Sequence, residues 1–311
     1  MTEPRPLASV VIANYNYGEF LPETLETVLA QTYQPIEIVV VDDGSTDDSR
    51  EVLARYPLHA IYQENAGQAA ALDVGVASAR GEIICLLDAD DGWDARKVER
   101  VVQILTRHPD VQWVRHELEV VDRWRRPLGP KLPHIRRSGP LPPSPAAVAE
   151  RVVVASTSAI TFRRAAARSV FPLPVRTHLR FDADALIVAG LGSRFRGWQL
   201  AETLGFYRRH ERQQYACEAD LERMIERQIE VGTLIAESLG RAEPVTNYKH
   251  RAILAALRGR PRRAEVLRGL VASLRLVSHP MIMARQAAAL LYAGTAPDLW
   301  LGKIRRFQGF Q

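Results

Sequence analysis

The feature that most constrains this chain is a run of apolar residues that ends abruptly in a group of acids. Residues 82–87 (EIICLL) lead directly into the acidic run Asp-Ala-Asp-Asp at 88–91. A short apolar run of this kind is typical of a central strand buried on both faces of a parallel sheet. Ligands of open α/β sheets bind at the carboxyl ends of such strands, so these acids are candidate site residues. The alternative is a solvated acidic turn before a helix N-terminus, where aspartate is favoured anyway.

The first hundred residues alternate apolar strands with helical patterns. Strands are predicted at residues 7–12, 36–41, 59–62 and 82–87, and helices at 20–31, from about 46 to 56, at 68–79 and at 94–105. This alternation is the βαβ rhythm of a mainly parallel sheet with helices on both faces. We therefore predict an α/β, Rossmann-like fold for this part of the chain.

A second strand of the predicted sheet also ends in acids. Residues 36–41 are followed by Asp42 and Asp43 on what should be the same sheet edge as the first acidic run. A carboxylate there can accept a hydrogen bond from a nucleobase imide or a ribose hydroxyl. Residues 44–47 (GSTD) are expected to form a turn and to cap the next helix.

The spacing of Asp88 and Asp90 suits a divalent cation. Two carboxylates at positions i and i+2 of a tight turn can direct oxygens at one ion, and Mg²⁺ or Mn²⁺ can then bridge to a diphosphate. Such an ion neutralises charge on a departing nucleoside diphosphate. The sequence thus predicts a metal and diphosphate site at this edge of the sheet.

The second half of the chain carries weaker signals. Residues 125–145 are rich in Pro, Gly and basic residues and are interpreted as a long loop or flap, in which His134, Arg136 and Arg137 are candidates for closing over phosphate. Strands are predicted through Val121 and at 151–162 and 198–207, with a short helix at 182–189. From residue 216 the pattern predicts helices only, at 216–239, 246–259, 261–277, 280–294 and 298–309. The predicted organisation is a catalytic domain at 1–215, with halves at 1–110 and 111–215, and an all-α extension at 216–311.

Charge is placed unevenly along the chain. The formal net charge is +5, and residues 251–311 hold 11 Lys and Arg against two acids. This asymmetry indicates either an anionic partner, such as a membrane surface, or solvated helix faces. The longest late uncharged run, 286–297, has 12 residues, against about 20 needed to span a bilayer. No nucleic-acid partner is predicted, and the oligomeric state is open.

The cysteines and the N-terminus bear on location. Cys85 and Cys217 lie far apart, with no spacing that indicates a disulfide framework or a zinc site. No secretory signal is visible after Met1. The expected location is the cytoplasm, with peripheral contact at the inner membrane face through the basic C-terminal helices as an open alternative.

Four motifs in order resemble the N-terminal half of family-2 glycosyltransferases. They are VVIANYN at 10–16, VDDGSTD at 41–47, NAG at 65–67 and LDADD at 87–91. The resemblance covers about residues 7–100. It implies a GT-A fold, an inverting mechanism and a nucleotide-sugar donor bound with Mn²⁺ or Mg²⁺ at the Asp-x-Asp pair.

The resemblance also assigns roles to individual positions. Those expected around the nucleotide sugar are Ala13, Tyr15, Asp43, Asn65, Gly67, Gln68 and Asp88, with Asp88 and Asp90 at the metal. Many relatives have Ser or Thr at position 13, so one hydroxyl contact is missing here and the base preference is open. UDP is the leading donor nucleotide, with GDP and dTDP as alternatives. Tyr15 has a second interpretation, as an aromatic residue covering the core at the end of a strand.

An inverting transfer needs a general base that removes the proton of the acceptor hydroxyl. The run RFDADAL at 180–186 is similar to an acidic region of the family, and Asp184 is the predicted base, with Asp182 as the alternative or as a helix cap. The run FYRRH at 206–210 resembles a Tyr-Arg-x-His ending. It places Arg208 near the diphosphate and His210 at the metal.

The predicted activity is that of an inverting, metal-dependent glycosyltransferase of the hexosyltransferase class. It would move a sugar from a nucleotide diphosphate sugar to a hydroxyl of a glycan, a lipid-linked acceptor or a cell-surface polysaccharide precursor. One alternative is a non-catalytic nucleotide-sugar-binding protein of the same fold. Another is a receiver-type signalling domain. Its phosphorylation site would account for Asp42, Asp43 and Asp88 but would leave Asp90 and Asp91 without a function.

Overall fold

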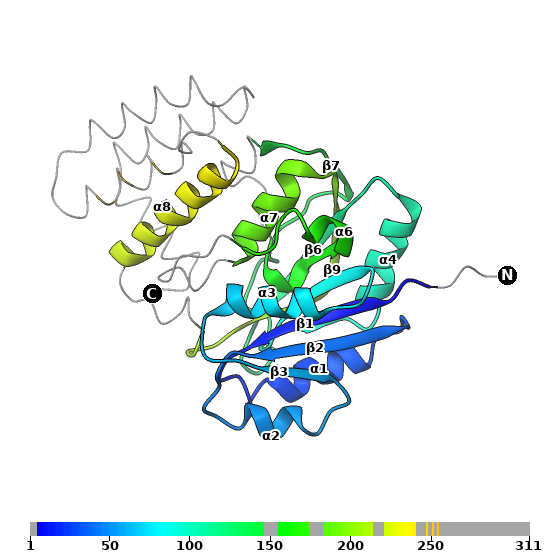
Figure 1. Ribbon diagram of the computed structural model, residues 1–311, viewed down its shortest axis with the longest axis vertical. Helices are drawn as coiled ribbons and strands as arrows, with labels where there is room; N and C mark the ends of the chain where they lie inside the picture. Colours follow the sequence, from blue (N-terminus) through cyan, green and yellow to red (C-terminus); the bar gives the residue numbers. More distant parts are fainter. Residues whose placement is uncertain are drawn as a thin grey trace. The chain divides into compact units, whose positions relative to one another are not determined.

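The computed structural model describes residues 5–145, 155–173, 183–213 and 221–240, together with residues 247, 251 and 254 (Figure 1). The chain divides into two compact units. The first comprises Met1–Pro143 and Val154–Ala216, and the second comprises Ser144–Val153 and Cys217–Gln311.

A mixed, mainly parallel sheet forms the frame of the first unit. Over the described residues its order is β3-β2-β1-β4-β8-β6-β9-β5, with β7 paired to β9. The strands are β1 (Ala8–Asn14), β2 (Ile36–Asp42), β3 (His59–Tyr62), β4 (Ile83–Asp88), β5 (Gly92–Trp93), β6 (Trp113–Asp122), β7 (Gly139–Leu141), β8 (Ile160–Arg163) and β9 (Gly197–Arg209). The predicted α/β fold, with a mainly parallel sheet, is confirmed.

Helices cover both faces of the parallel part of the sheet. They are α1 (Leu21–Leu29), α2 (Ser49–Leu53), α3 (Gln68–Ser78) and α4 (Lys97–Arg107), followed by the 3₁₀ turn η1 (Thr157–Ala159), α6 (Arg164–Ala167) and α7 (Ala183–Arg194). Apolar residues of α1 and α4 form one core with Val10 and Ile12 of β1. On the other face α3 lies so close to β1 that a Cβ on Gly75 would be 2.4 Å from Val11 Cγ1, so this position requires glycine.

The parallel register brings the ends of three strands together. Ala13 of β1 lies opposite Val41 of β2 on one side and Asp88 of β4 on the other. Asp43 and Asp90 therefore leave the sheet at the same edge, as the alternation of strands and helices predicts.

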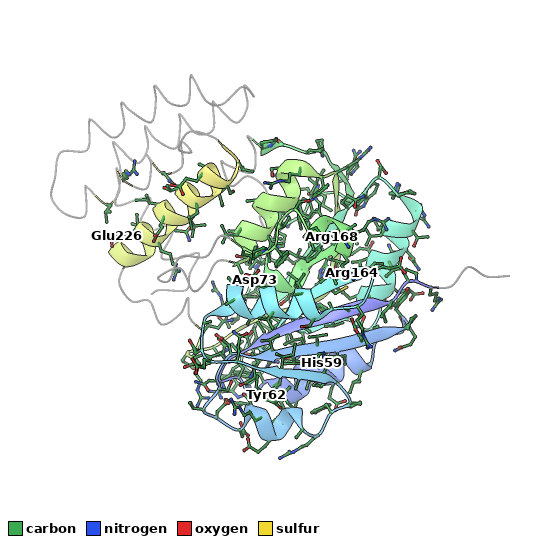
Figure 2. All side chains as sticks on the ribbon, in the orientation of Figure 1. His59, Tyr62, Asp73, Arg164, Arg168 and Glu226 are labelled. Atoms are coloured by element: carbon green, nitrogen blue, oxygen red, sulfur yellow. The ribbon has the colours of Figure 1, made fainter. Side chains whose placement is uncertain are left out.

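The second half departs from the predicted elements in two places. The strand predicted at 151–162 is wrong over residues 157–159, which form η1, and pairing in β8 begins only at Ile160. The loop at 125–145 is not free of structure, because Leu132 exchanges backbone hydrogen bonds with Leu118 and residues 139–141 pair with β9. Asp73 on α3, which is labelled in Figure 2, accepts a hydrogen bond of 2.9 Å from the backbone N–H of Leu173.

In the second unit the described residues contain one long helix, α8 (Leu221–Ser238). Asn247 Nδ2 donates to the backbone oxygen of Ile229 at 2.8 Å and to Thr233 Oγ1 at 3.1 Å. The helices predicted beyond residue 254 lie outside the described residues, so the all-α extension stays a prediction. No helix among the described residues has the length and apolar character that crossing a bilayer requires.

Candidate functional site

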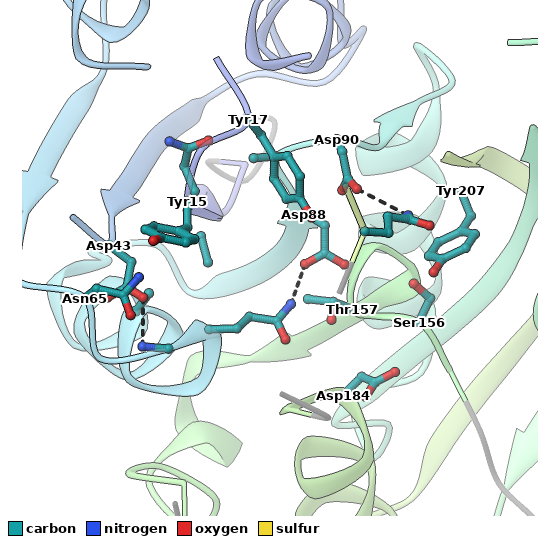
Figure 3. Close-up of a pocket in the computed structure, with 17 residues that line it drawn as sticks. Tyr15, Tyr17, Asp43, Asn65, Asp88, Asp90, Ser156, Thr157, Asp184 and Tyr207 are labelled. Atoms are coloured by element: carbon teal, nitrogen blue, oxygen red, sulfur yellow. Dashed lines mark hydrogen bonds between the residues drawn. The ribbon is translucent and has the colours of Figure 1, made fainter. Parts of the chain in front are cut away.

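A cavity of about 210 Å³ opens at the carboxyl edge of the parallel strands (Figure 3). Most of the sequence-predicted residues line it. The lining residues are Ala13, Asn14, Tyr15, Tyr17, Asp43, Asn65, Gly67, Gln68, Ala71, Asp88, Ala89, Asp90, Ser156, Thr157, Asp184, Tyr207 and Gln213. The cavity is thus polar and acidic, with aromatic rings on its walls.

The two acids at the end of β2 have different roles. Asp42 is fully buried and accepts hydrogen bonds from Asn14 Nδ2 at 2.9 Å and from the Ser45 N–H at 3.0 Å, which fixes the turn. Asp43 lines the cavity and accepts from the backbone N–H groups of Ala66 at 2.8 Å and Gly67 at 2.7 Å. Asp43 therefore holds the 65–67 loop at one end of the cavity, beside Tyr15 (Figure 3).

Asp88 lies near the middle of the cavity wall. Its Oδ1 accepts a hydrogen bond of 2.7 Å from Gln68 Nε2, the first residue of α3. Burial, and then the nearby charges of Asp90 and Asp184, raise the pKa of Asp88 to about 8. The carboxylates of Asp90 and Asp184 therefore both repel that of Asp88, and a cation placed beside Asp88 would relieve that repulsion.

Asp91 faces the protein interior instead of the cavity. It is fully buried and accepts hydrogen bonds from Ser158 Oγ at 2.6 Å and from the Arg208 N–H at 2.9 Å. Burial, with the charges of Asp90 and Asp88, raises its pKa well above the usual range. Asp91 therefore links the turn at residues 88–91, called here the acidic turn, to η1 and β9.

Removing the Asp91 side chain should destabilise the fold. In Asp91→Ala the Ser158 hydroxyl and the Arg208 N–H lose their acceptor inside the protein, so we expect the free energy of unfolding to fall by about 2 kcal/mol or more. Urea titration followed by circular dichroism measures this. Asp91→Asn keeps one acceptor oxygen and should lose less. Equal stability of Asp91→Ala and the wild type would contradict the structural role.

Asp90 and His210 face each other across the turn. His210 Nε2 lies 3.0 Å from Asp90 Oδ2, and both side chains are almost completely buried. The His210 ring packs against Phe20, with 4.4 Å between ring centroids, and its Nδ1 has no hydrogen-bond partner among the described residues. Gln213 Nε2 also reaches Asp90 Oδ2, at 3.3 Å.

The donor set at Asp90 fits Mn²⁺ or Mg²⁺ with an incomplete protein shell. Among the described residues no three His, Cys, Asp or Glu side chains converge as a metal site. A carboxylate with one imidazole leaves several positions for other ligands. This is the usual arrangement of a cation that is also held by substrate phosphates.

Arg208 does not line the cavity. Its guanidinium donates to the backbone oxygens of Asp90 and Arg123, both at 2.8 Å, and pairs with Glu23 at 2.5 Å. The side chain is 2% exposed. In this geometry Arg208 stabilises the acidic turn through its hydrogen bond to the Asp90 backbone oxygen, on the side away from the cavity. The sequence instead predicts a contact with the nucleotide sugar. His134, Arg136 and Arg137 also lie outside the cavity lining.

Asp184 lies in the first turn of α7 and lines the cavity wall (Figure 3). Its Oδ1 accepts a hydrogen bond of 2.7 Å from the Ala185 N–H. Its charge contributes to the raised pKa of Asp88, so the two carboxyl groups share one cavity. Asp182 lies outside the described residues.

Sequence reasoning missed six cavity residues that carry polar groups. They are Asn14, Tyr17, Ser156, Thr157, Tyr207 and Gln213. Burial and the neighbouring carboxylates raise the pKa values of both tyrosines, which keeps their hydroxyl groups protonated as donors. The hydroxyl-rich run at 156–158 was a usable signal, because three consecutive hydroxyl side chains fit poorly inside the strand predicted there.

The chain is similar to known glycosyltransferases in sequence and in fold. A profile described as "Glycosyl transferase family 2" matches residues 9–171. An uncharacterized glycosyltransferase of Nostoc sp. is 36% identical over 215 residues, which cover 65% of this chain and 64% of that protein. The match therefore spans less than two thirds of that relative's length.

Two solved structures share the fold. Residues 1–349 of S. aureus TarS, in complex with UDP-GlcNAc, align with a TM-score of 0.58 at 17% identity, over 92% of this chain and 81% of that one. The mannosyltransferase PcManGT from Pyrobaculum calidifontis, in complex with GDP-Man and Mn²⁺, aligns with a TM-score of 0.56 at 19% identity, over 98% of this chain and 86% of that one.

Proposed function

Because the chain belongs to glycosyl transferase family 2, we propose that it transfers a sugar from a nucleotide diphosphate donor to a hydroxyl acceptor, with a divalent metal and inversion at the anomeric carbon. The observation that carries this proposal is the single cavity shared by Asp43, Asp88, Asp90 and Asp184. One space thus joins groups suited to a nucleoside, a diphosphate with its metal, and an acceptor hydroxyl.

The nucleoside belongs at the end of the cavity formed by Tyr15, Asp43 and the 65–67 loop. Tyr15 is 38% exposed, so its ring is available to stack on a base. Ala13 and Gly67 leave room beside it, and the amides of Asn65 and Gln68 lie along the same wall. UDP is the first donor nucleotide to test, and GDP the second, because fold neighbours are solved with UDP-GlcNAc and with GDP-Man.

The metal belongs at Asp90 and His210, with Asp88 beside them. When bound, Mn²⁺ or Mg²⁺ would neutralise charge on the departing nucleoside diphosphate. The protein's own contribution is to hold Asp90 in place: its backbone oxygen accepts from Arg208 and its carboxylate is met by His210 and Gln213. A turn fixed on three sides is already organised for its ligand.

Asp184 is the proposed general base. It would accept the acceptor's proton while the hydroxyl oxygen attacks the anomeric carbon from the face opposite the leaving diphosphate. A carboxylate separated from the Asp90 end of the cavity suits this direction of attack. The acceptor class we propose is a glycan, free or lipid-linked, such as a cell-surface polysaccharide precursor.

The alternative of the same fold is a protein that binds nucleotide sugar without turnover. A panel of UDP-, GDP- and dTDP-sugars with Mn²⁺ tests the proposal, by calorimetry for binding and by release of free nucleoside diphosphate for turnover. We expect micromolar to millimolar affinity for one nucleotide and slow donor hydrolysis without acceptor. Binding with no hydrolysis or transfer from any donor favours the non-catalytic alternative, and no binding at all contradicts both. The receiver alternative is set aside, because the chain belongs to another family.

The location and the tail remain part of this proposal. We place the enzyme in the cytoplasm, with residues 251–311 as the basic segment that would contact the inner membrane face. Liposome flotation of the full chain against a chain ending at Gln214 tests the contribution of the tail.

A further inference from the structure

One turn on the first unit presents two large apolar side chains to solvent. The turn at residues 122–128, called here the Trp124 turn, follows β6. Trp124 is 67% exposed and Leu128 is 51% exposed, which makes them the two most exposed large hydrophobic residues of the described part of the chain. Isolated apolar residues on a surface are ordinary, but two bulky ones on one short turn indicate an interaction site.

The protein holds this turn in a defined shape. Asp122 Oδ1 accepts hydrogen bonds from the N–H groups of Trp124 at 2.9 Å and Arg126 at 2.8 Å. The Leu128 N–H donates to the Val120 oxygen at 2.8 Å. Arg125 has a φ of 66°, a left-handed conformation that a non-glycine residue adopts only when its surroundings fix it. The exposure of Trp124 and Leu128 therefore results from a built turn.

Arginines surround the two apolar side chains. Arg123 pairs with Glu19 at 2.5 Å and Arg125 pairs with Glu23 at 3.1 Å, which anchors the turn to the segment around α1. Arg126 is exposed, and no carboxylate of the described residues pairs with it; its guanidinium lies 5.7 Å from the centre of the Trp124 ring. The surface around Trp124 thus combines apolar groups with unpaired positive charge.

The turn is joined directly to the acidic turn of the candidate site. The backbone oxygen of Arg123 accepts from Arg208 Nη1, and the backbone oxygen of Asp90 accepts from Nε of the same guanidinium, both at 2.8 Å. The side chain of Arg208 therefore links the Trp124 turn to the turn that carries Asp90.

We propose that the Trp124 turn docks on an anionic phospholipid bilayer, with Trp124 and Leu128 entering the interface and Arg126 meeting lipid phosphates. Tryptophan and arginine are the side chains that suit the boundary between head groups and acyl chains. Two side chains offer on the order of 300 Å² of apolar surface. A stable protein partner needs about 800 Å² on each side, whereas a bilayer needs only a few inserted groups with charge.

The Trp124 turn belongs to the first unit and is distinct in sequence from the basic segment at 251–311. Its proposed docking does not depend on the proposed chemistry. Docking here would bring the cavity to the surface where lipid-linked molecules lie. Donor hydrolysis measured without vesicles should stay the same when the turn is altered, so failure of docking and failure of the proposed function can be told apart.

The contact can be detected through Trp124 itself. The full chain is mixed with vesicles of phosphatidylglycerol and phosphatidylcholine in which part of the lipid carries brominated acyl chains, which quench tryptophan at short range. The chain has five tryptophans, of which Trp93 and Trp113 are 4% and 1% exposed. Because Trp300 lies in the basic segment that is itself proposed to contact the membrane, the measurement is made in a Trp300→Phe background. There we expect quenching, and loss of most of it when Trp124→Phe is added; this variant should still bind within about twofold because phenylalanine also partitions into the interface.

A double variant and a matched control measure the affinity. Trp124→Ser with Arg126→Glu should lower the vesicle partition coefficient at least about tenfold. The control is Tyr62→Ser with Arg55→Glu, which exchanges the same kinds of side chain elsewhere on the first unit. Tyr62 is 47% exposed on the edge strand β3 (Figure 2), and Arg55 is exposed in the segment after α2. It should bind as the wild type does. Circular dichroism is used to check that both double variants are folded.

Three outcomes would overturn the proposal. The first is equal partition of the two double variants, which would assign any binding to other parts of the chain. The second is quenching that persists unchanged in Trp124→Phe. The third is binding of soluble polyphosphate that depends on Arg126 while vesicles are not bound, which would assign the turn to a polyanionic chain.

Discussion

Replacing Asp184 with asparagine is expected to lower kcat for sugar transfer by about 10³-fold, while the Kd for the nucleotide sugar with Mn²⁺ changes less than threefold. Asparagine has nearly the same shape but cannot accept the acceptor's proton, and a positioned general base contributes about 10² to 10⁴ in rate. Asp184 also adds to the negative charge around Asp88, so removing its charge should not weaken donor binding. The measurement is transfer to a hydroxyl acceptor, with donor binding followed separately by calorimetry.

Asp182 supplies the matched control for this experiment. It lies two residues away in the same acidic run, and Asp182→Asn removes the same charge. We expect Asp182→Asn to retain kcat within about tenfold, as for a residue outside the reacting groups. If kcat falls about 10³-fold in Asp182→Asn but not in Asp184→Asn, the base is Asp182. If neither variant loses activity, the base lies in another segment.

The parallel half of the fold could be predicted because local pattern and long-range pairing agree there. The run at 82–87 is apolar at every position after Glu82, and in the structure β4 lies between β1 and β8 with both faces covered. Once three parallel strands stand side by side, their ends share one edge, so Asp43 and Asp88 come together without further information. A strand pattern with its turn residues was therefore enough to locate this part of the site.

The remainder depends on contacts between distant segments, which a single sequence does not reveal. Ser158 meets Asp91 across 67 positions, and Arg208 reaches Asp90 across 118. Lys97, the first residue of α4, is a further example. Its side chain is fully buried, and its Nζ lies 3.6 Å from the centre of the Trp93 ring and 3.0 Å from Thr161 Oγ1. A lysine at a helix start is ordinarily exposed, so only the tertiary structure identifies it as part of the core.

The difference between Asp90 and Asp91 illustrates the same limit at adjacent positions. In the sequence the two residues are adjacent acids of one motif. In the structure the Asp90 carboxylate faces His210, whereas the Asp91 carboxylate faces Ser158. The first is placed to meet a cation and the second to hold the turn. Their variants should accordingly fail in different assays, one in metal binding and the other in stability.

Asp90→Ala is expected to abolish measurable high-affinity binding of Mn²⁺ in the presence of nucleoside diphosphate and to reduce transfer by about 10³-fold. The loss of this ligand leaves His210, Asp88 and the phosphates to hold the ion. Charge neutralisation of a leaving diphosphate is worth several kcal/mol, and each 1.36 kcal/mol equals a factor of ten in rate. Mn²⁺ binding is followed by electron paramagnetic resonance of the free ion, which reports on the metal site without turnover. Nucleotide binding without metal should persist, because the Tyr15 and Asp43 end of the cavity is unchanged.

Asp110→Ala is the control, since this aspartate is exposed, pairs with Arg196 at 2.7 Å and lies outside the cavity lining. It should bind Mn²⁺ and transfer sugar as the wild type does. Asp90 also accepts from Gln213, so the thermal midpoint of Asp90→Ala is compared with that of Asp91→Ala to separate a lost ligand from a loosened turn. A variant that keeps its fold but loses Mn²⁺ places the metal at Asp90. One that keeps both Mn²⁺ affinity and turnover would remove the metal from this position, and with it the proposed role of the Asp88 and Asp90 pair.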